Sequence, residues 1–266
     1  MKTKKKIIYA IIICILITIL IITATRLINS KKRTTKFENN IQTFIEQNSK
    51  KIFTINKILY FSSSDAKNKT STGSNFTIEN LYTYTDIAIF LQTNTEEYTL
   101  ENTLKSLKIT NIKYSELPKI GEPSLYYKPI QDFAKSEIKE ENKIENEINF
   151  EITSEEKTNL DKPILYNNCA NPITLSYINQ NIKTDYTILD TINPITYDGT
   201  LLKRCAIPLS YLKTKIYLEI EIENNKQEKF KTNINLEIPY ENEEKTIYDG
   251  NIIIKKEIDN NFYRYE

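Results

Sequence analysis

The chain has 266 residues, 36 of them Lys or Arg and 35 Asp or Glu, with no histidine, no tryptophan and four glycines. The lack of histidine excludes Ser-His-Asp and Cys-His catalysis, and four scattered glycines exclude phosphate loops such as G-x-G-x-x-G. Residues 1–36 hold nine Lys and Arg and no Asp or Glu, so residues 37–266 have a net charge of −8, a poor match for nucleic acid, whose binding needs a cationic surface.

A long uncharged segment comes first in the chain, at residues 7–25. Its 19 residues follow three lysines and include only three polar side chains, all threonines. A helix of this length is close to the ~30 Å thickness of the hydrocarbon core of a bilayer. A cleaved signal peptide is the alternative, but the apolar run exceeds the usual ~7–15 residues and lacks a small-x-small exit. We therefore predict an uncleaved signal anchor that contacts the lipid bilayer through residues 7–25.

The orientation of this anchor is predicted from the lengths of its flanks. Basic residues stand on both sides of it, so the positive-inside rule discriminates little. A short N-terminal tail is a poor candidate for translocation, whereas long domains cross largely regardless of charge. We expect a single-pass protein of the cell membrane with a cytoplasmic N-terminus and an extracytoplasmic C-terminal domain in the cell envelope.

The residues after the anchor change their hydrophobic period. Phe37, Ile41, Phe44 and Ile45 share one face of a short amphipathic helix. From residue 53 the apolar residues recur with period two, which predicts strands, and strand-forming residues return over 76–93, 106–115 and 123–130. The charged run at 135–149 has no apolar stripe and predicts an exposed linker between two modules.

The clearest pattern lies near the C-terminus. Apolar and acidic residues alternate over 215–223, and a second alternating run follows at 230–238, which predicts an antiparallel hairpin with one buried face. Asp198-Gly199 and Asp249-Gly250 predict two further hairpins with type I′ turns. Many short strands with close turn signals favour an immunoglobulin-like antiparallel β-sandwich.

The predicted fold class is therefore mainly β: an N-terminal transmembrane helix followed by a β-rich ectodomain. Its predicted parts are a cytoplasmic basic tail at 1–6, the signal anchor at 7–25, a juxtamembrane basic segment with a short helix at 26–50, a β-rich module at 51–135, a charged linker at 136–147 and a β-sandwich module at 148–266.

Two cysteines of the ectodomain, Cys169 and Cys205, are predicted to form a disulfide, as suits an extracytoplasmic pair. Two separate buried thiols are the alternative. A redox or metal pair is disfavoured, because the chain has no C-x-x-C motif and no histidine to complete a zinc site. No metal and no cofactor are predicted.

Tyrosine is abundant, with 18 residues, and several occur as close pairs. Tyrosine is favoured at protein interfaces and is also a common strand residue, so both roles stay open. The pairs that we regard as interface candidates are Tyr82, Tyr84, Tyr126 and Tyr127.

No set of residues predicts catalysis. Ser-x-x-Lys occurs three times, as expected by chance in this composition, and lacks its companion motifs. We expect the protein not to be an enzyme, but an anchored module that binds or scaffolds other envelope or membrane proteins. The alternatives are a receptor for a small ligand or a cell-wall glycan and, less favoured, a carboxylate-based envelope hydrolase.

Overall fold

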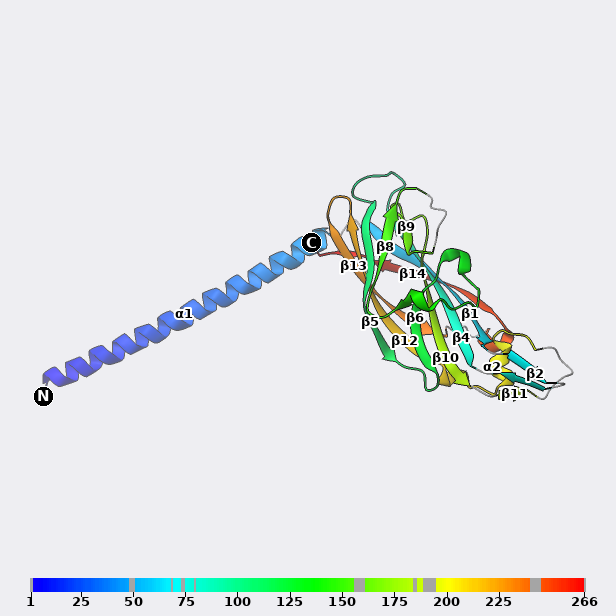
Figure 1. The fold of residues 1–266 in the computed structure, drawn as a ribbon. Coiled ribbons are helices and arrows are strands. Elements are labelled where there is room, and N and C mark those ends of the chain that lie inside the picture. Colours follow the sequence, from blue (N-terminus) through cyan, green and yellow to red (C-terminus); the bar gives the residue numbers. More distant parts are fainter. Residues whose placement is uncertain are drawn as a thin grey trace. The chain divides into compact units, whose positions relative to one another are not determined.

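The computed structural model describes residues 2–47, 51–67, 69–72, 75–78, 80–155, 161–183, 186–188, 195–239 and 245–265 (Figure 1). In the N-terminal helix, side chains are described at residue 13 and over 15–40. The chain divides into two units, Met1–Ser49 and Lys50–Glu266, and each is described by itself.

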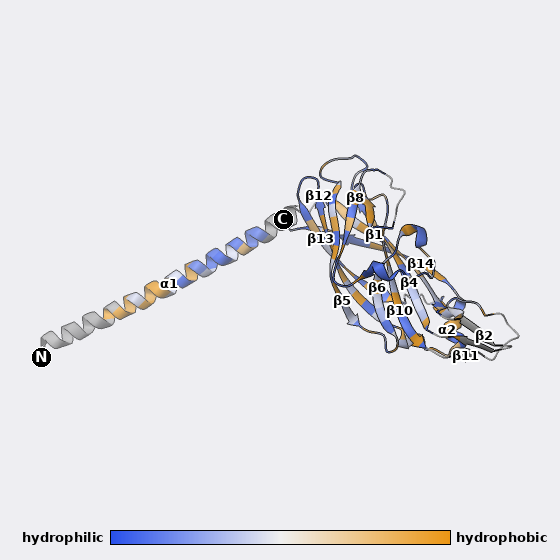
Figure 2. Ribbon diagram, in the orientation of Figure 1, coloured by the Kyte–Doolittle hydropathy of each residue, from blue (hydrophilic) through white to orange (hydrophobic). Residues whose placement is uncertain are grey.

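The first unit is one helix, α1, which runs over Lys2–Gln47. The predicted anchor and the predicted juxtamembrane helix are therefore parts of a single helix. Its described part changes from hydrophobic to hydrophilic toward the C-terminal end (Figure 2). Over the described residues, no helix combines the length and hydropathy that crossing a membrane requires. Some side chains lie outside the described ones. In the predicted span these are residues 7–12 and 14, and in the amphipathic stretch they are residues 41–47.

The second unit contains two six-stranded sheets and a small third one (Figure 1). In the first sheet the order is β14 (Ile252–Asn261), β1 (Phe53–Ala66), β4 (Leu81–Thr93), β10 (Ile173–Lys183), β6 (Glu122–Tyr127) and β7 (Lys143–Ile144). In the second it is β15 (Tyr263–Arg264), β13 (Lys229–Ile238), β12 (Thr214–Asn224), β5 (Leu104–Glu116), β8 (Ile148–Thr153) and β9 (Ile164–Tyr166). The third contains β11 (Tyr186–Ile188), β3 (Asn75–Ile78) and β2 (Lys69–Thr72).

Short helical turns connect these strands: η1 (Ile130–Asp132), η2 (Glu140–Asn142), α2 (Thr200–Arg204), η3 (Leu209–Tyr211) and η4 (Ile247–Asp249). Buried side chains of the two large sheets, such as Ile87 from β4 and Leu218 from β12, pack into one hydrophobic core. The mainly β class is thus confirmed, while the immunoglobulin-like arrangement stays a prediction.

Strands from both predicted modules pair within each large sheet. β1 pairs with β14, β4 with β10, and β5 with β12, so each of these pairs joins strands from either side of the predicted linker at 136–147. The structure therefore corrects the division into 51–135 and 148–266, because neither part could complete its sheets alone. Most of the predicted linker is irregular, with η2 and the two-residue strand β7 inside it.

The hairpin predicted over 215–238 is confirmed as β12 and β13. Alternate residues of β12 are buried, and those from Thr214 to Ile222 each face an apolar partner or a threonine on β13, as Leu218 faces Ile234. On the outer face, Glu221 of β12 lies opposite Lys231 of β13 and forms an ion pair of 3.0 Å with Lys108 of β5. The acidic stripe is thus matched by lysines on both neighbouring strands.

The two Asp-Gly pairs do not form the predicted hairpin turns. Asp198-Gly199 precedes α2, where Asp198 Oδ1 accepts a hydrogen bond of 2.9 Å from the Thr200 amide. Asp249-Gly250 ends η4, and Gly250 adopts a φ of 109°. The two motifs pack against each other: a Cβ at Gly199 would lie 1.8 Å from the Ile247 carbonyl oxygen. Gly199 is needed for close backbone packing, and its φ of −58° is one that any residue adopts.

The predicted disulfide is absent, and Cys169 and Cys205 are both free thiols. Cys169 belongs to the main core, whereas Cys205 belongs to a second cluster that packs α2 against the ends of β1 and β14. Burial raises the pKa of Cys169 to about 12 and that of Cys205 to about 11, so both stay protonated at neutral pH. The alternative of two separate buried thiols describes the structure.

The close approach at Gly199 predicts a steric penalty. Gly199→Ala should lower the free energy of unfolding by about 1–3 kcal/mol, because the new methyl group meets backbone atoms of η4. Ala206→Gly is the matched reverse change: Ala206 has a φ of 52°, so glycine there should stabilise by up to about 1 kcal/mol. Urea denaturation measures the change in the free energy of unfolding for both variants, which should be negative for Gly199→Ala and positive for Ala206→Gly. A Gly199→Ala variant as stable as the wild type would contradict this packing.

The free thiols give a second prediction. The melting temperature should be the same with and without reductant, because no covalent link exists to break. Cys169 and Cys205 should react with N-ethylmaleimide only after unfolding, as measured by mass spectrometry of their peptides. Recovery of a peptide pair linked through the two sulfur atoms from unreduced protein would show this prediction to be wrong.

Candidate functional site

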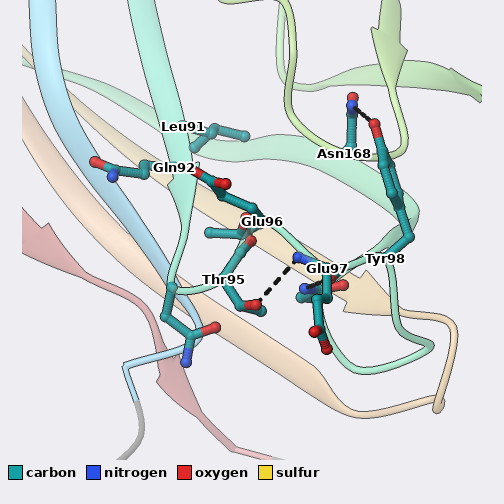
Figure 3. A pocket seen from close by; sticks show the side chains of 10 residues that line it. Leu91, Gln92, Thr95, Glu96, Glu97, Tyr98 and Asn168 are labelled. Carbon is teal, nitrogen blue, oxygen red and sulfur yellow. Dashed lines mark hydrogen bonds between the residues drawn. The ribbon is translucent and has the colours of Figure 1, made fainter.

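A polar cleft of about 540 Å³ lies at the end of β4, where the chain leaves the first sheet and crosses to the second (Figure 3). Ten residues from two separate segments line it: Leu91, Gln92, Thr93, Asn94, Thr95, Glu96, Glu97, Tyr98, Asn102 and Asn168. Nine of these side chains carry a hydrogen-bonding group. The cleft is within the ~300–1,000 Å³ range of ligand sites but is more polar than most.

The loop after β4 is held in shape by Asn102, whose side chain is 4% exposed. Asn102 Oδ1 accepts a hydrogen bond of 2.8 Å from the Thr99 amide, and its Nδ2 donates to the Glu97 carbonyl. At the start of the loop, the Asn94 amide donates to the carbonyl oxygen of Ile52, at 3.1 Å. The backbone that carries the lining residues is thus tied to the sheet at one end and to a buried amide at the other.

Tyr98 and Asn168 form one side of the cleft, opposite Leu91 and Gln92 (Figure 3). Tyr98 is 68% exposed, and its hydroxyl accepts a hydrogen bond from Asn168 Nδ2. Asn168 Oδ1 in turn accepts from the Ala170 amide at 3.1 Å, across Cys169, which has a φ of 61°. An exposed aromatic ring is therefore held by a side chain that is fixed by its own loop.

The charges at the cleft have one sign. Glu96 and Glu97 are exposed carboxylates, and none of the ten lining residues is Lys or Arg. The other polar groups are the neutral amides and hydroxyls of Gln, Asn, Thr and Tyr, which can donate as well as accept. The arrangement can bind a neutral polar ligand or a cation, and it repels anions.

The four tyrosines that the sequence analysis named as interface candidates are buried. Tyr82, Tyr84 and Tyr126 form an aromatic cluster on the outer face of the first sheet, which Phe133 and Ile138 partly cover. Tyr127 belongs to the main core. Each is at most 7% exposed, so these residues pack within the chain, which is one of the two roles that the sequence left open.

A buried ion pair lies beside that aromatic cluster. Asp86 of β4 is fully buried, and Lys128, which follows β6, is 4% exposed. Lys128 Nζ is 3.6 Å from Asp86 Oδ2 and donates to the Lys135 carbonyl at 2.6 Å. The Asp86 carboxylate also accepts from Ser176 Oγ, at 2.6 Å, and from the Ala134 amide, at 2.7 Å. Burial raises the pKa of Asp86 to about 6, although these three partners favour the ionised form.

This Ser-Asp-Lys group serves packing. The space beside Lys128 and Ser176 amounts to about 10 Å³, which is barely enough for one water molecule. Its bonds reach the backbone of residues 134–137, so they hold the covering segment onto the outer face of the first sheet. A substrate cannot reach Ser176, and we assign the group no catalytic step.

Neither a cluster of metal ligands nor a similarity to known proteins points to another candidate site. Within the described ranges, no group of three or more Cys, Asp or Glu side chains is arranged to hold a metal ion. Comparison of the chain with protein-family models, with characterised proteins and with solved structures finds no match. The polar cleft, which the sequence analysis missed, is therefore the candidate site, on its geometry alone. Its only signal in the sequence is the polar run over 92–97 after a strand.

The raised pKa of Asp86 predicts a pH dependence of stability. Because its folded-state pKa of about 6 exceeds the unfolded value of 3.8, folding takes up a proton between these values, and the stability contributed by Asp86 falls as the pH rises. The wild type should lose up to about 3 kcal/mol relative to Asp86→Asn between pH 4 and pH 7. Urea titrations across this range measure the difference.

The matched control for this measurement is Asp259→Asn, which removes an exposed carboxylate at 76% side-chain exposure. This variant should track the wild type across the same pH range. If Asp86→Asn also tracks the wild type, Asp86 ionises with no net cost in the folded protein, and the packing role assigned to its partners must be revised.

Proposed function

We propose that this protein is a non-catalytic receptor that residues 7–25 anchor in the membrane and whose extracytoplasmic β-domain binds a small polar ligand. The observation that carries the proposal is the cleft at the end of β4, which has the volume of a ligand site and is lined from two segments. Most of the binding groups lie on loops that the sheets position, and the others lie at the end of β4, which is the usual arrangement of binding residues on β-scaffolds.

The anchor is proposed from the sequence, and the local geometry of α1 is compatible with it without being specific to it, since Thr34 beyond the segment makes the same kind of bond. The segment has 19 consecutive uncharged residues. Two of its threonines turn their hydroxyls back onto the helix: Thr23 Oγ1 donates to the Ile19 carbonyl at 3.0 Å, and Thr25 Oγ1 to the Ile21 carbonyl at 2.5 Å. Such bonds satisfy hydroxyl groups where water is scarce. The basic residues after the segment suit the lipid headgroups.

Protein binding, as in a scaffold of the envelope, is a second candidate, and one observation favours it. Leu100 is 64% exposed and follows the cleft-lining Tyr98 by two residues in the chain, so this loop carries both an exposed apolar and an exposed aromatic side chain. Aromatic and apolar residues of this kind are typical anchors of interfaces. The immunoglobulin-like architecture predicted from the sequence is compatible with both candidates and decides neither.

Ligand binding is tested on the full-length protein in nanodiscs. A panel of neutral sugars, amines, amino acids and anionic sugars is screened by thermal shift, followed by calorimetry on each compound that raises the melting temperature. A ligand of the cleft should lose about tenfold in affinity with Asn168→Ala, because this variant removes an amide that lines the cleft as well as the support of Tyr98. Tyr211→Ala, at a tyrosine that is 42% exposed and away from the lining, is the control.

Two results would contradict the receptor proposal. One is a panel in which no compound binds, and the other is binding that Asn168→Ala leaves unchanged. Crosslinking in the native membrane distinguishes protein binding from ligand binding. If the protein is a scaffold, Leu100→Ala should abolish crosslinking to a partner protein and leave the affinity for any small ligand unchanged.

A further inference from the structure

We propose that the ligand of this cleft is an uncharged saccharide, which stacks on the ring of Tyr98 and hydrogen-bonds to the amides and hydroxyls around it. This inference rests on the receptor function proposed above and names its ligand class. It is carried by three observations: the donor and acceptor character of the lining, the sign of its charge and the exposed aromatic ring.

The polar groups that line the cleft favour a ligand that both donates and accepts hydrogen bonds. Six of the ten lining residues are neutral amides or threonines, and an amide presents N–H donors as well as a carbonyl acceptor. Gln92 Oε1 already accepts a bond of 3.0 Å from Asn56 Nδ2, so the donors of Gln92 are what remain for a ligand. An ammonium or guanidinium group only donates and would leave such donors without partners. Sugar hydroxyls donate and accept, so they satisfy both kinds of group.

The charge of the cleft excludes the anionic members of the same class. Glu96 and Glu97 both line it and no cationic side chain does, so a carboxylate or phosphate on the ligand would meet like charge. The same two carboxylates are strong acceptors for hydroxyl groups, because hydrogen bonds to an ionised acceptor are shorter and stronger than neutral ones. Glu96 and Glu97 therefore increase the affinity for neutral sugars and decrease the affinity for uronic acids and sugar phosphates.

Tyr98 supplies the apolar contact that a sugar ring needs. Its side chain is 68% exposed, and the bond from Asn168 to its hydroxyl restricts the ring in the absence of ligand. Tyrosine has only two side-chain torsions to order and presents a flat face with a polar tip. The C–H face of a pyranose covers such a ring while the hydroxyls at its edge reach the polar groups beside it.

The test compares three disaccharides of different charge: N,N′-diacetylchitobiose (neutral), chitobiose (a diamine) and the hyaluronan disaccharide (a carboxylate). Full-length protein in phosphatidylcholine nanodiscs is titrated with each by calorimetry or saturation-transfer NMR. We expect the neutral sugar to bind about tenfold more tightly than the anionic one. The double variant Glu96→Gln, Glu97→Gln should reduce this preference to about threefold or less by improving the binding of the anion.

Tyr98 variants give an independent readout. Tyr98→Ala should weaken the neutral sugar about tenfold, whereas Tyr98→Phe, which keeps the ring and loses only the hydroxyl, should weaken it less than threefold. Leu117→Ala, at an exposed residue away from the lining, is the control for changes in surface area.

The outcomes separate this inference from the receptor function on which it rests. Tightest binding of the diamine, or of another non-sugar from the panel, would overturn the saccharide class while a receptor cleft remains. A neutral sugar whose affinity is unchanged by Tyr98→Ala would overturn the proposed stacking. If no compound of any class binds, both proposals fall together.

Discussion

The central constraint on this fold is the burial of β4 on both of its faces. The first nine residues of the strand, Leu81 to Ile89, are all buried, which requires cover above and below the sheet. The second sheet covers the inner face through the shared core, and the aromatic cluster with its covering segment packs on the outer face. Because β4 pairs with β1 along 13 register positions and with β10 on its other side, the chain before residue 100 cannot fold without residues after 170.

This constraint explains why a buried charge is tolerated at Asp86. The outer face of β4 must be covered by a segment with little regular structure, whose backbone N–H and C=O groups need partners. Asp86 and Lys128 supply one acceptor and one donor to that backbone, at Ala134 and Lys135. An ion pair of this kind contributes little to net stability, since desolvation offsets the attraction. Its role is to fix one position of the segment, which an apolar pair would not specify.

The sequence was most informative where a single pattern decides the structure. The alternation over 215–238 predicted β12 and β13 because a period of two assigns every side chain to a face. Asp-Gly pairs were misleading, because the backbone approach that Gly199 permits is a tertiary contact with Ile247, invisible from local turn preferences. The role of the tyrosines stayed open for a related reason. Whether a strand tyrosine is exposed depends on what covers the sheet, and here the covering segment is a charged run that resembles a linker.

The cleft was hidden from sequence patterns for a different reason, and this reason also supports its function. Its two sides are about 70 residues apart in the chain, at Tyr98 and Asn168. Their loops are brought together by the pairing of β4 with β10 and by the hydrogen bond of 2.6 Å from the Leu104 amide to the Asn167 carbonyl. Each loop is fixed before any ligand arrives, one by the buried amide of Asn102 and the other by the backbone bonds around Cys169. A preformed site spends less binding energy on ordering itself. Polar side chains of low individual affinity can therefore act together in this cleft, as recognition of a neutral, hydroxyl-rich ligand requires.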